Sequence, residues 1–207
     1  MLTFYTNPYS RGRIVRWMLE ELGAPYEQRV LGYDTSMKAP DYLALNPMGK
    51  VPAIVHDGHI VTEGAAICAY LADAFPEAGL APRPGLARAS YYRWMFFGAG
   101  PVESAVCDRM LKVEPTPEQQ RAVGYGDFDR VLRTLDIAVS NAPYLAGDHF
   151  SAADVYVGSQ IGFGMQFNTI PASSALTAYW ARIKDRPARL KAAAMDDALV
   201  AEMRANG

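Results

Sequence analysis

The chain has 207 residues, half of them hydrophobic and a fifth charged, with a formal net charge of −2 at pH 7. This composition is typical of a globular protein and gives no electrostatic argument for binding nucleic acid or an anionic membrane. No apolar run approaches the ~20 residues that span a bilayer, and the first residues lack the pattern of a secretory signal. We therefore expect a cytoplasmic protein of one large domain or two small ones.

The two cysteines and three histidines argue against covalent or metal cross-links. Cys68 and Cys107 lie far apart within helical patterns, which argues against a disulfide framework and suits a reducing compartment. His56, His59 and His149 are not grouped with other ligands at metal-binding spacing. We therefore predict no metal site.

The first part of the chain alternates strand and helix patterns. A strand is expected over 2–6, a helix from residue 10 or 11 to 22, and a second strand over 26–31, with Gly23 ending the helix. Strand, helix and strand within about thirty residues form a βαβ unit, so these two strands should be parallel.

A hairpin follows in the segment from Asn46 to Leu71. Its turn is expected at Asp57-Gly58, because this pair tolerates the positive φ of a two-residue hairpin. The elements predicted around it are a short helix near 39–45, strands at 53–55 and 60–61, and a helix over 64–75. The order βαβαββα predicts a mixed four-stranded sheet with helices on both faces.

Pro52 is the unusual residue of this segment. Proline donates no ladder hydrogen bond, so at a strand start it marks an edge or an irregular backbone. Taken by itself, Pro52 is better explained as a strand-initiating residue than as a cis proline that turns the backbone of Val51 outward, because cis bonds are rare even before proline.

A segment rich in proline and glycine, from Pro76 to Gly85, marks the end of this first part. We place a first domain at 1–77, a linker at 78–85 and an all-helical domain at 86–207. The helices expected after the linker are 86–111, kinked or divided by Gly98, Gly100 and Pro101, then 117–141 with Thr116 as N-cap, 151–166, 175–186 and 187–203.

The sequence Phe150-Ser151-Ala152-Ala153-Asp154-Val155 is a sharp helix-start signal. Ser151 fits an N-cap, and Asp154 stands where a capping-box side chain reaches back. Phe150 and Val155 occupy the positions of a hydrophobic staple. Because a cap accounts for all four residues, we interpret Asp154 as structural and not catalytic.

Together these features resemble the cytosolic glutathione transferases of bacterial type over essentially the whole chain. The likeness is carried by YTNPYSRGRIVRWMLEELG at 5–23, NPMGKVP at 46–52, the Glu63-Gly64 pair and FSAADV at 150–155. It implies a thioredoxin-like first domain, an all-helical second domain, glutathione as co-substrate with no other cofactor, a homodimer and a role in detoxification.

The resemblance also implies residues that bind glutathione. In the family the proline matching Pro52 is cis, and the backbone of the residue matching Val51 pairs with the cysteinyl part of glutathione. Lys50 matches a position that often contacts the glycyl end. Glu63 matches the acidic residue that binds the γ-glutamyl end, whereas Gly64 replaces the family's serine. The backbone N–H of Gly64 can still donate to a carboxylate at a helix N-terminus.

The chemistry needs a thiolate, and three hydroxyl groups are candidates to stabilise it. Lowering a thiol pKa from ~8.5 by roughly two units requires about 2.7 kcal/mol, and a hydroxyl at a helix N-terminus beside a guanidinium is a suitable source. Ser10, followed by Arg11, resembles the catalytic position of the serine- and cysteine-type classes and is the first choice, although it also fits a plain N-cap. Tyr5 falls where the tyrosine-type classes keep their hydroxyl, and Tyr9 is a third option.

A hydrophobic electrophile pocket is expected between the domains. Its candidate lining residues are Tyr9, Trp94, Phe97, Phe163, Met165 and Phe167. Aromatic residues at helical spacing belong more often to a core, but the glycines of GFGMQF at 162–167 leave space in which their bulky neighbours could form a cavity. By resemblance, Glu103 is expected to reach the glutathione of the second subunit.

The leading expectation is an enzyme that adds the glutathione thiolate to small hydrophobic electrophiles. A glutathione-dependent peroxidase or reductase is an alternative, although Ser10 occupies the position where such classes have a cysteine. A maleylacetoacetate-type isomerase is disfavoured because its serine-serine-cysteine start is absent. A non-catalytic assembly domain of the same fold is the remaining alternative, and the retention of Ser10, Arg11, Lys50, Pro52 and Glu63 argues against it.

Overall fold

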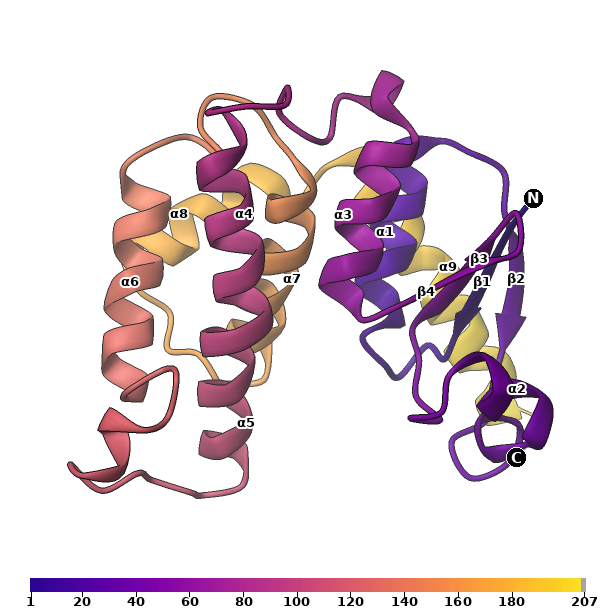
Figure 1. Ribbon diagram of the computed structural model, residues 1–207, viewed down its shortest axis with the longest axis horizontal. Helices are drawn as coiled ribbons and strands as arrows, with labels where there is room; N and C mark the ends of the chain where they lie inside the picture. Colours follow the sequence, from indigo (N-terminus) through magenta and orange to yellow (C-terminus); the bar gives the residue numbers. More distant parts are fainter. Residues whose placement is uncertain (206–207) are drawn as a thin grey trace. The chain divides into compact units, whose positions relative to one another are not determined.

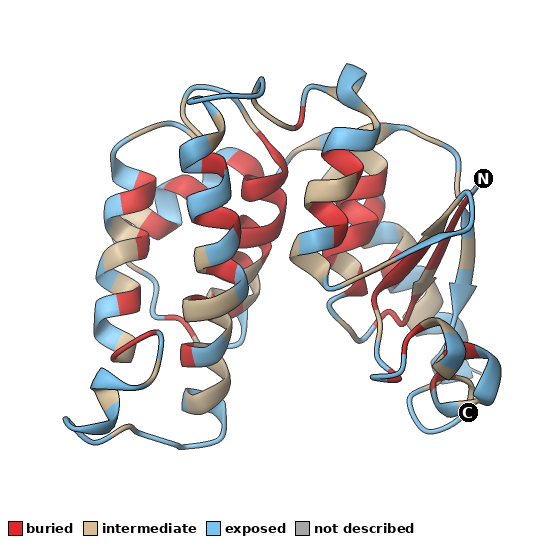
Figure 2. Cartoon of the chain, in the orientation of Figure 1, coloured by how far each residue is buried: buried red, intermediate tan, exposed pale blue. Residues whose placement is uncertain are grey.

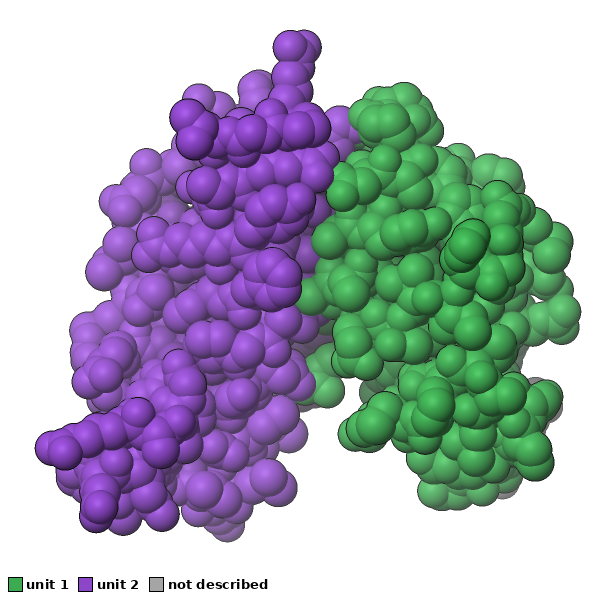
Figure 3. Space-filling view, viewed as in Figure 1, with its two compact units in different colours: residues 1–78, 186–207 green, residues 79–185 purple. Residues whose placement is uncertain are grey.

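The computed structural model describes residues 1–205, and the chain forms two compact units (Figures 1 and 3). The first unit contains residues 1–78 together with the chain from Arg186 onward. The second contains residues 79–185. We describe each unit separately.

A four-stranded mixed sheet forms the centre of the first unit. Its strands are β1 (Leu2–Thr6), β2 (Glu27–Val30), β3 (Ala53–His56) and β4 (His59–Thr62), in the order β2-β1-β3-β4. β1 is parallel to β2 and antiparallel to β3, and β3 and β4 form a hairpin. The hairpin turns at Asp57 and Gly58, with φ of 48° and 83°. The predicted βαβ unit and hairpin are confirmed.

The two faces of the sheet have different covers. Phe4 and Ile54 are paired partners, and both are fully buried. They lie on the face covered by α1 (Gly12–Leu22) and α3 (Gly64–Ala74). The buried residues of these two helices stand out in Figure 2. On the other face, the paired residues Tyr5 and Ala53 contact a small cluster. This cluster includes Met37 and Tyr42, from the 3₁₀ turn Ser36–Lys38 and α2 (Pro40–Leu45).

The last helix, α9 (Pro187–Ala205), packs along α1 and therefore belongs to the first unit (Figure 1). The sequence alone places residues 187–203 in the helical domain at 86–207, so the contacts group this helix differently. The physical reason is a row of ion pairs between α9 and α1, such as Arg16 with Asp196, whose partners are too far apart in sequence to be recognised as neighbours.

The second unit is helical and is organised around one buried helix. Its elements are α4 (Arg88–Phe97), a π-helical turn (Gly98–Val102), α5 (Glu103–Met110), α6 (Phe128–Ser140), α7 (Ala152–Gln166) and α8 (Ser174–Ile183). The π turn contains Pro101, so the predicted division of this helix is confirmed. α7 is buried along most of its length, as expected for a helix surrounded by others.

The helix predicted over 117–141 is wrong in its first part. Thr116 and Gln119 do exchange the hydrogen bonds of a capping box, but they start only a 3₁₀ turn (Gln119–Arg121). Gly126, with φ of 72°, interrupts the chain before α6 starts. The carboxylate of Asp127 then caps α6.

The predicted capping box at the start of α7 is confirmed. The Ser151 side chain accepts from the backbone of Asp154, and the Asp154 carboxylate accepts from the Ser151 N–H at 2.9 Å. The same carboxylate also accepts from the Leu145 N–H and the Tyr179 hydroxyl, at 2.9 and 2.8 Å. Asp154 is therefore a structural residue with four donors around it.

Candidate active site

The candidate site residues of the first unit lie at one end of its sheet. β1 ends at Thr6, and Tyr5 pairs with Ala53, the first residue of β3. Ala53 also pairs with Thr62, the last residue of β4. Three segments therefore meet at this end: the loop that leads to α1, the segment that precedes β3 and the start of α3 (Figure 1).

Asn7 organises the loop between β1 and α1. Its side chain is buried, with a relative exposure of 1% for the residue. The amide nitrogen donates to the Leu31 carbonyl at 2.7 Å, and the amide oxygen accepts from the Tyr9 N–H at 3.0 Å, which is the hydrogen bond of an Asx turn. The loop is thus attached to the end of β2 and bent toward the first turn of α1.

The hydroxyl of Ser10 lies at the start of α1 and is held from two sides. It donates to the Asn7 carbonyl at 2.7 Å and accepts from the Gly12 N–H at 2.9 Å. A Cβ at Gly12 would lie 2.1 Å from Oγ1 of Thr6, so the close approach of α1 to β1 requires glycine there. The N-cap of α1 is Arg11 and not Ser10, but the Ser10 oxygen accepts from the first N–H of the helix, so its direction is defined.

The other proposed donors lie elsewhere. Tyr5 faces the side of the sheet opposite to the Phe4 face, and its ring lies 5.5 Å from that of Tyr42. Tyr9 is 52% exposed. Arg11 directly follows Ser10 and is exposed. Burial raises the pKa of the Tyr33 phenol, and the nearby Arg11 charge opposes part of this rise. Chain adjacency thus brings Ser10 and Arg11 together, whereas Tyr5 projects toward α2.

The segment before β3 is fixed by side chains of α2 and the residues around it. The Val51–Pro52 peptide bond is cis, as the resemblance implied. The Lys50 carbonyl accepts from the Tyr42 hydroxyl at 2.6 Å and from the Asn46 side chain at 2.8 Å. Burial raises the pKa of Tyr42 to about 12, so this hydroxyl stays protonated as a donor.

Val51 itself lies beyond the strand ladder, because the pairing of β3 with β4 begins at Ala53 and Thr62. Its side chain packs on the cluster around Tyr42, and the side chain of Lys50 is exposed. The backbone of Val51 is therefore next to the sheet without being part of the ladder. Such a position suits hydrogen bonding to an extended peptide.

The start of α3 presents backbone N–H groups without an acidic side chain in its first turn. Glu63 is the N-cap residue, is exposed and has a φ of 66°. Its carbonyl accepts the first helical bond from Ile67 at 2.8 Å. Gly64 begins the helix. A helix start of this kind favours an anion, because its first N–H groups have no helical partner and the helix dipole is positive there.

The aromatic residues proposed for an electrophile pocket have different environments. Trp94 is 7% exposed and packs edge-on against Phe97 at 5.6 Å. Phe163 is half-buried, and Phe167 is 68% exposed. A Cβ at Gly162 would lie 2.6 Å from the Trp180 ring. The interpretation of GFGMQF as a cavity is therefore wrong at this glycine, whose space the Trp180 ring occupies.

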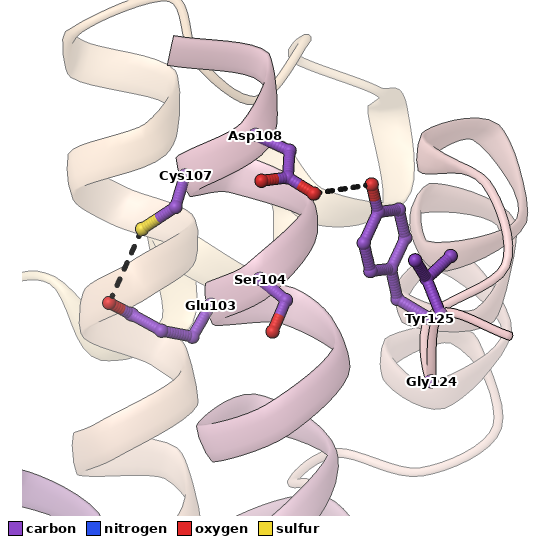
Figure 4. A pocket seen from close by; sticks show the side chains of 7 residues that line it. Glu103, Ser104, Cys107, Asp108, Gly124 and Tyr125 are labelled. Atoms are coloured by element: carbon purple, nitrogen blue, oxygen red, sulfur yellow. Dashed lines mark hydrogen bonds between the residues drawn. The ribbon is translucent and has the colours of Figure 1, made fainter. Parts of the chain in front are cut away.

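A pocket of about 460 Å³ whose lining includes two carboxylates lies in the second unit (Figure 4). Its lining residues are Glu103, Ser104, Cys107, Asp108, Val123, Gly124 and Tyr125. The Tyr125 hydroxyl donates to Asp108 at 2.7 Å, and the Cys107 thiol donates to Glu103 at 3.7 Å. Glu103 also accepts from the Gln160 side chain at 3.4 Å. This pocket is acidic, unlike the aromatic pocket that the sequence predicted.

Two further findings limit the kinds of site. Within residues 1–205 no His, Cys, Asp and Glu side chains form a group of three that could hold a metal ion. Among the same residues, none of the helices combines the length and apolar character needed to cross a membrane.

Sequence reasoning missed two residues of the β1–α1 loop region. Asn7 could have been found, because Asn-Pro commonly begins a turn and its side chain accepts from the backbone two residues later. Arg13 donates to the Pro8 carbonyl at 2.6 Å and to Asp197 at 2.8 Å. No local pattern connects Arg13 with a residue 184 positions away.

The sheet order β2-β1-β3-β4, with a cis proline before β3 and α1 and α3 on one face, defines a thioredoxin-like domain. Residues 8–74 match the family model of the glutathione S-transferase N-terminal domain. Two relatives that are at least 30% identical match the chain over most of their own length, so the chain belongs to the glutathione S-transferase family of enzymes; a solved structure agrees.

The relatives cover most of the chain. Glutathione S-transferase GST-4.5 of Xanthomonas campestris is 32% identical over 75% of this chain and 79% of its own. Glutathione S-transferase-like protein OpS6 of Beauveria bassiana is 30% identical over 93% of this chain and 92% of its own. A sphingomonad glutathione S-transferase complexed with glutathione has a TM-score of 0.77 and 29% identity, over 94% of this chain and 98% of that one.

Proposed function

We propose that this protein conjugates the thiolate of glutathione to small hydrophobic electrophiles. The observation that carries the proposal is the Ser10 hydroxyl, held at the start of α1 by Asn7 and Gly12. It lies at the same end of the sheet as the Val51 backbone and the start of α3. The three features suit the three parts of glutathione. The hydroxyl suits the thiol, the Val51 backbone suits the peptide, and the helix start suits the γ-glutamyl carboxylate.

In the proposed complex, glutathione lies along the segment that precedes β3. The backbone of Val51, next to Pro52, pairs with the cysteinyl residue in the manner of an added strand. The exposed Lys50 ammonium attracts the glycyl carboxylate. Glu63 accepts from the γ-glutamyl ammonium, and the Gly64 N–H donates to the neighbouring carboxylate at the start of α3.

The Ser10 hydroxyl can stabilise the thiolate without leaving its place. Its oxygen continues to accept from Gly12 while its proton rotates from the Asn7 carbonyl to the sulfur, because a hydroxyl has one donor and two acceptor positions. Arg11 adds positive potential. Lowering the thiol pKa by roughly two units takes about 2.7 kcal/mol, which charge-assisted hydrogen bonding and the helix dipole can supply together.

We propose that the electrophile binds against aromatic side chains. The residues are Tyr9, Trp94, Phe97, Phe163 and Phe167. Tyr9 and Phe167 are exposed, which supports direct contact with a ligand. Trp94 is buried and packs against Phe97, so its proposed role is to support the Phe97 ring.

The remaining proposals concern organisation. We propose a cytoplasmic homodimer acting in detoxification, with a glutathione-binding domain at 1–77, a linker at 78–85 and a helical domain at 86–207, and with glutathione as the only co-substrate besides the electrophile. Glu103 is proposed to reach the glutathione of the second subunit. Its present contacts with Cys107 and Gln160 give it an alternative intramolecular role.

A peroxidase or reductase activity has less support. Cys68 is fully buried, and burial raises the pKa of its thiol far above the ordinary value, so this thiol is unsuited to exchange. Cys107 lies in α5 of the second unit, and its thiol donates a hydrogen bond to the Glu103 carboxylate. Neither thiol lies in the loop that holds Ser10.

The experiment compares Ser10→Ala with Tyr5→Phe and Tyr9→Phe. Bound glutathione is titrated by ultraviolet difference absorbance of the thiolate, and turnover is measured with a chloronitrobenzene acceptor. We expect Ser10→Ala to raise the thiol pKa by at least one unit, which is about tenfold less thiolate at neutral pH, while the tyrosine variants keep the wild-type pKa. A wild-type pKa in Ser10→Ala, with a raised one in Tyr5→Phe, would transfer the role to Tyr5. Absence of glutathione binding and turnover in the unmodified protein would favour the assembly alternative.

A further inference from the structure

A row of ion pairs joins α1 to α9 and to Arg186, the residue directly before α9, within the first unit. The pairs and their distances are Arg13–Asp197 at 2.8 Å, Arg16–Asp196 at 2.8 Å, Glu20–Lys191 at 2.6 Å and Glu21–Arg186 at 2.6 Å. We call this row the α1–α9 seam. It fixes the first helix to the last one by charged groups along much of the length of α1.

The anchor of the seam is the pair Arg16–Asp196. Both side chains are essentially inaccessible, with exposures of 0% and 1%. The guanidinium also donates to the Tyr26 hydroxyl at 3.2 Å and lies 5.3 Å from the centre of the Phe4 ring. Removing one partner of such a buried pair leaves an uncompensated charge in the core, which is strongly destabilising. The pair therefore defines how α9 lies on α1.

The next residue along α9 makes the contact that matters for the site. Asp197 accepts from Nη2 of Arg13 at 2.8 Å, while Nε of the same guanidinium donates to the Pro8 carbonyl at 2.6 Å. Pro8 lies within the Asx turn of Asn7, and the Asn7 carbonyl accepts the Ser10 hydroxyl. One planar guanidinium thus connects α9 to the loop that holds Ser10.

We propose that Arg13, oriented by Asp197, is a positioning residue that holds the Pro8–Ser10 loop so that the Ser10 hydroxyl points at the glutathione sulfur. This inference rests on the proposed function. Arg13 acts through the loop backbone, because its Nε donor is used by Pro8 and its Nη2 donor by Asp197. Asp197 holds the guanidinium plane in the orientation that both bonds need, a task that an ammonium cannot perform in the same way.

The test uses Arg13→Gln, Arg13→Lys and Asp197→Asn, with Arg29→Gln as the matched control. Arg29 forms an exposed pair with Glu27 at 2.6 Å on β2, so its removal changes the net charge equally. We expect Arg13→Gln to lower the thiolate fraction of bound glutathione at neutral pH by about threefold to tenfold. Arg13→Lys and Asp197→Asn should give smaller reductions, and Arg29→Gln none.

A double variant separates positioning from direct electrostatic action. In a Ser10→Ala background, Arg13→Gln should leave the thiol pKa unchanged, because the hydroxyl that it positions is absent. An equal shift in both backgrounds would overturn the proposal and assign a direct effect to the guanidinium charge. Equal thiol pKa values in Arg13→Gln and Arg29→Gln would also overturn it, because removing the loop contact would then have no effect of its own.

Amide hydrogen exchange tests the positioning without glutathione. Arg13→Gln should speed the exchange of the Ser10 and Gly12 N–H groups relative to Arg29→Gln, at equal global stability in urea. Unchanged exchange at both amides would overturn the proposal. Faster exchange in a protein that binds no glutathione would support the positioning by Arg13 and reject the proposed function.

Discussion

The starts of α1 and α7 each have a serine, and the two starts are built for different purposes. At α7, Ser151 is followed three residues later by Asp154, whose carboxylate accepts from the serine N–H. At α1, Ser10 is followed three residues later by Arg13, whose guanidinium points back to the loop carbonyl of Pro8. The first turn of α1 contains no acidic side chain.

The charge of the residue three positions after each serine explains the difference, although Ser151 is the N-cap of α7 and Ser10 directly precedes Arg11, the N-cap of α1. The start of α7 is satisfied by its own carboxylate and buried, since Ser151 and Asp154 are at most 2% exposed. At the start of α1, no acidic side chain of the first turn faces the N–H groups and the positive end of the helix dipole. Ser10 is half-buried there. A helix start without its own acid is suited to an external anion such as a thiolate. The start of α7 is therefore closed by its own carboxylate, whereas the start of α1 is open to an external anion.

The strongest test of the α7 start is Asp154→Ala. This change leaves four donors without their acceptor, and each buried unsatisfied group costs about 1–3 kcal/mol. We expect the free energy of unfolding in urea to fall by at least about 3 kcal/mol. Asp154→Asn, which keeps one acceptor oxygen, should lose less. Equal stability of Asp154→Ala and the unmodified protein would refute the structural role.

The milder change at the same helix is Ser151→Ala. It removes the cap but keeps the Asp154 carboxylate, so we expect a loss of about 1 kcal/mol in unfolding free energy. The thiol pKa of bound glutathione should not change. Ser10→Ala gives the reciprocal pattern, with a raised thiol pKa and a smaller effect on stability than on turnover. If both serine variants shifted the thiol pKa equally, the two starts would not differ in function as we describe.

The smallest expected effect concerns the start of α3, which also lacks an acidic residue in its first turn. Gly64→Ser adds a hydroxyl that can donate to the γ-glutamyl carboxylate, and one such hydrogen bond is worth about 0.5–1.5 kcal/mol. We expect glutathione to bind about threefold to tenfold more tightly by calorimetry. Gly64→Ala is the matched control, because it adds a Cβ without a donor. Equal affinities for the serine and alanine variants would place the γ-glutamyl end elsewhere.

Most strands and helices of the first unit could be predicted from local sequence patterns. Strand periodicity, the Asp57-Gly58 turn and the glycine after α1 each reflect backbone preferences of a few neighbouring residues. The same holds for the capping box at Ser151. The helix predicted over 117–141 is wrong in its first part because the Thr116 cap starts only a short turn and Gly126, with a positive φ, interrupts the segment before α6.

The features that failed or were missed depend on contacts between distant segments. The space beside Gly162 is occupied by Trp180 of another helix. The sequence can indicate that a small residue is present, but not whether the space beside it forms a cavity or is filled by a neighbouring side chain.

The sequence by itself determined the order of strands and helices and the cap of α7, since these follow from short-range backbone and side-chain preferences. The candidate hydroxyls followed from its resemblance to the family. Only the tertiary structure decided that Tyr5 faces Tyr42, that α9 packs on α1, and that Arg13 connects Asp197 to the loop of Ser10. The physical reason is that side-chain direction and long-range ion pairing depend on how the chain folds back on itself, and no local pattern encodes a contact across 184 residues.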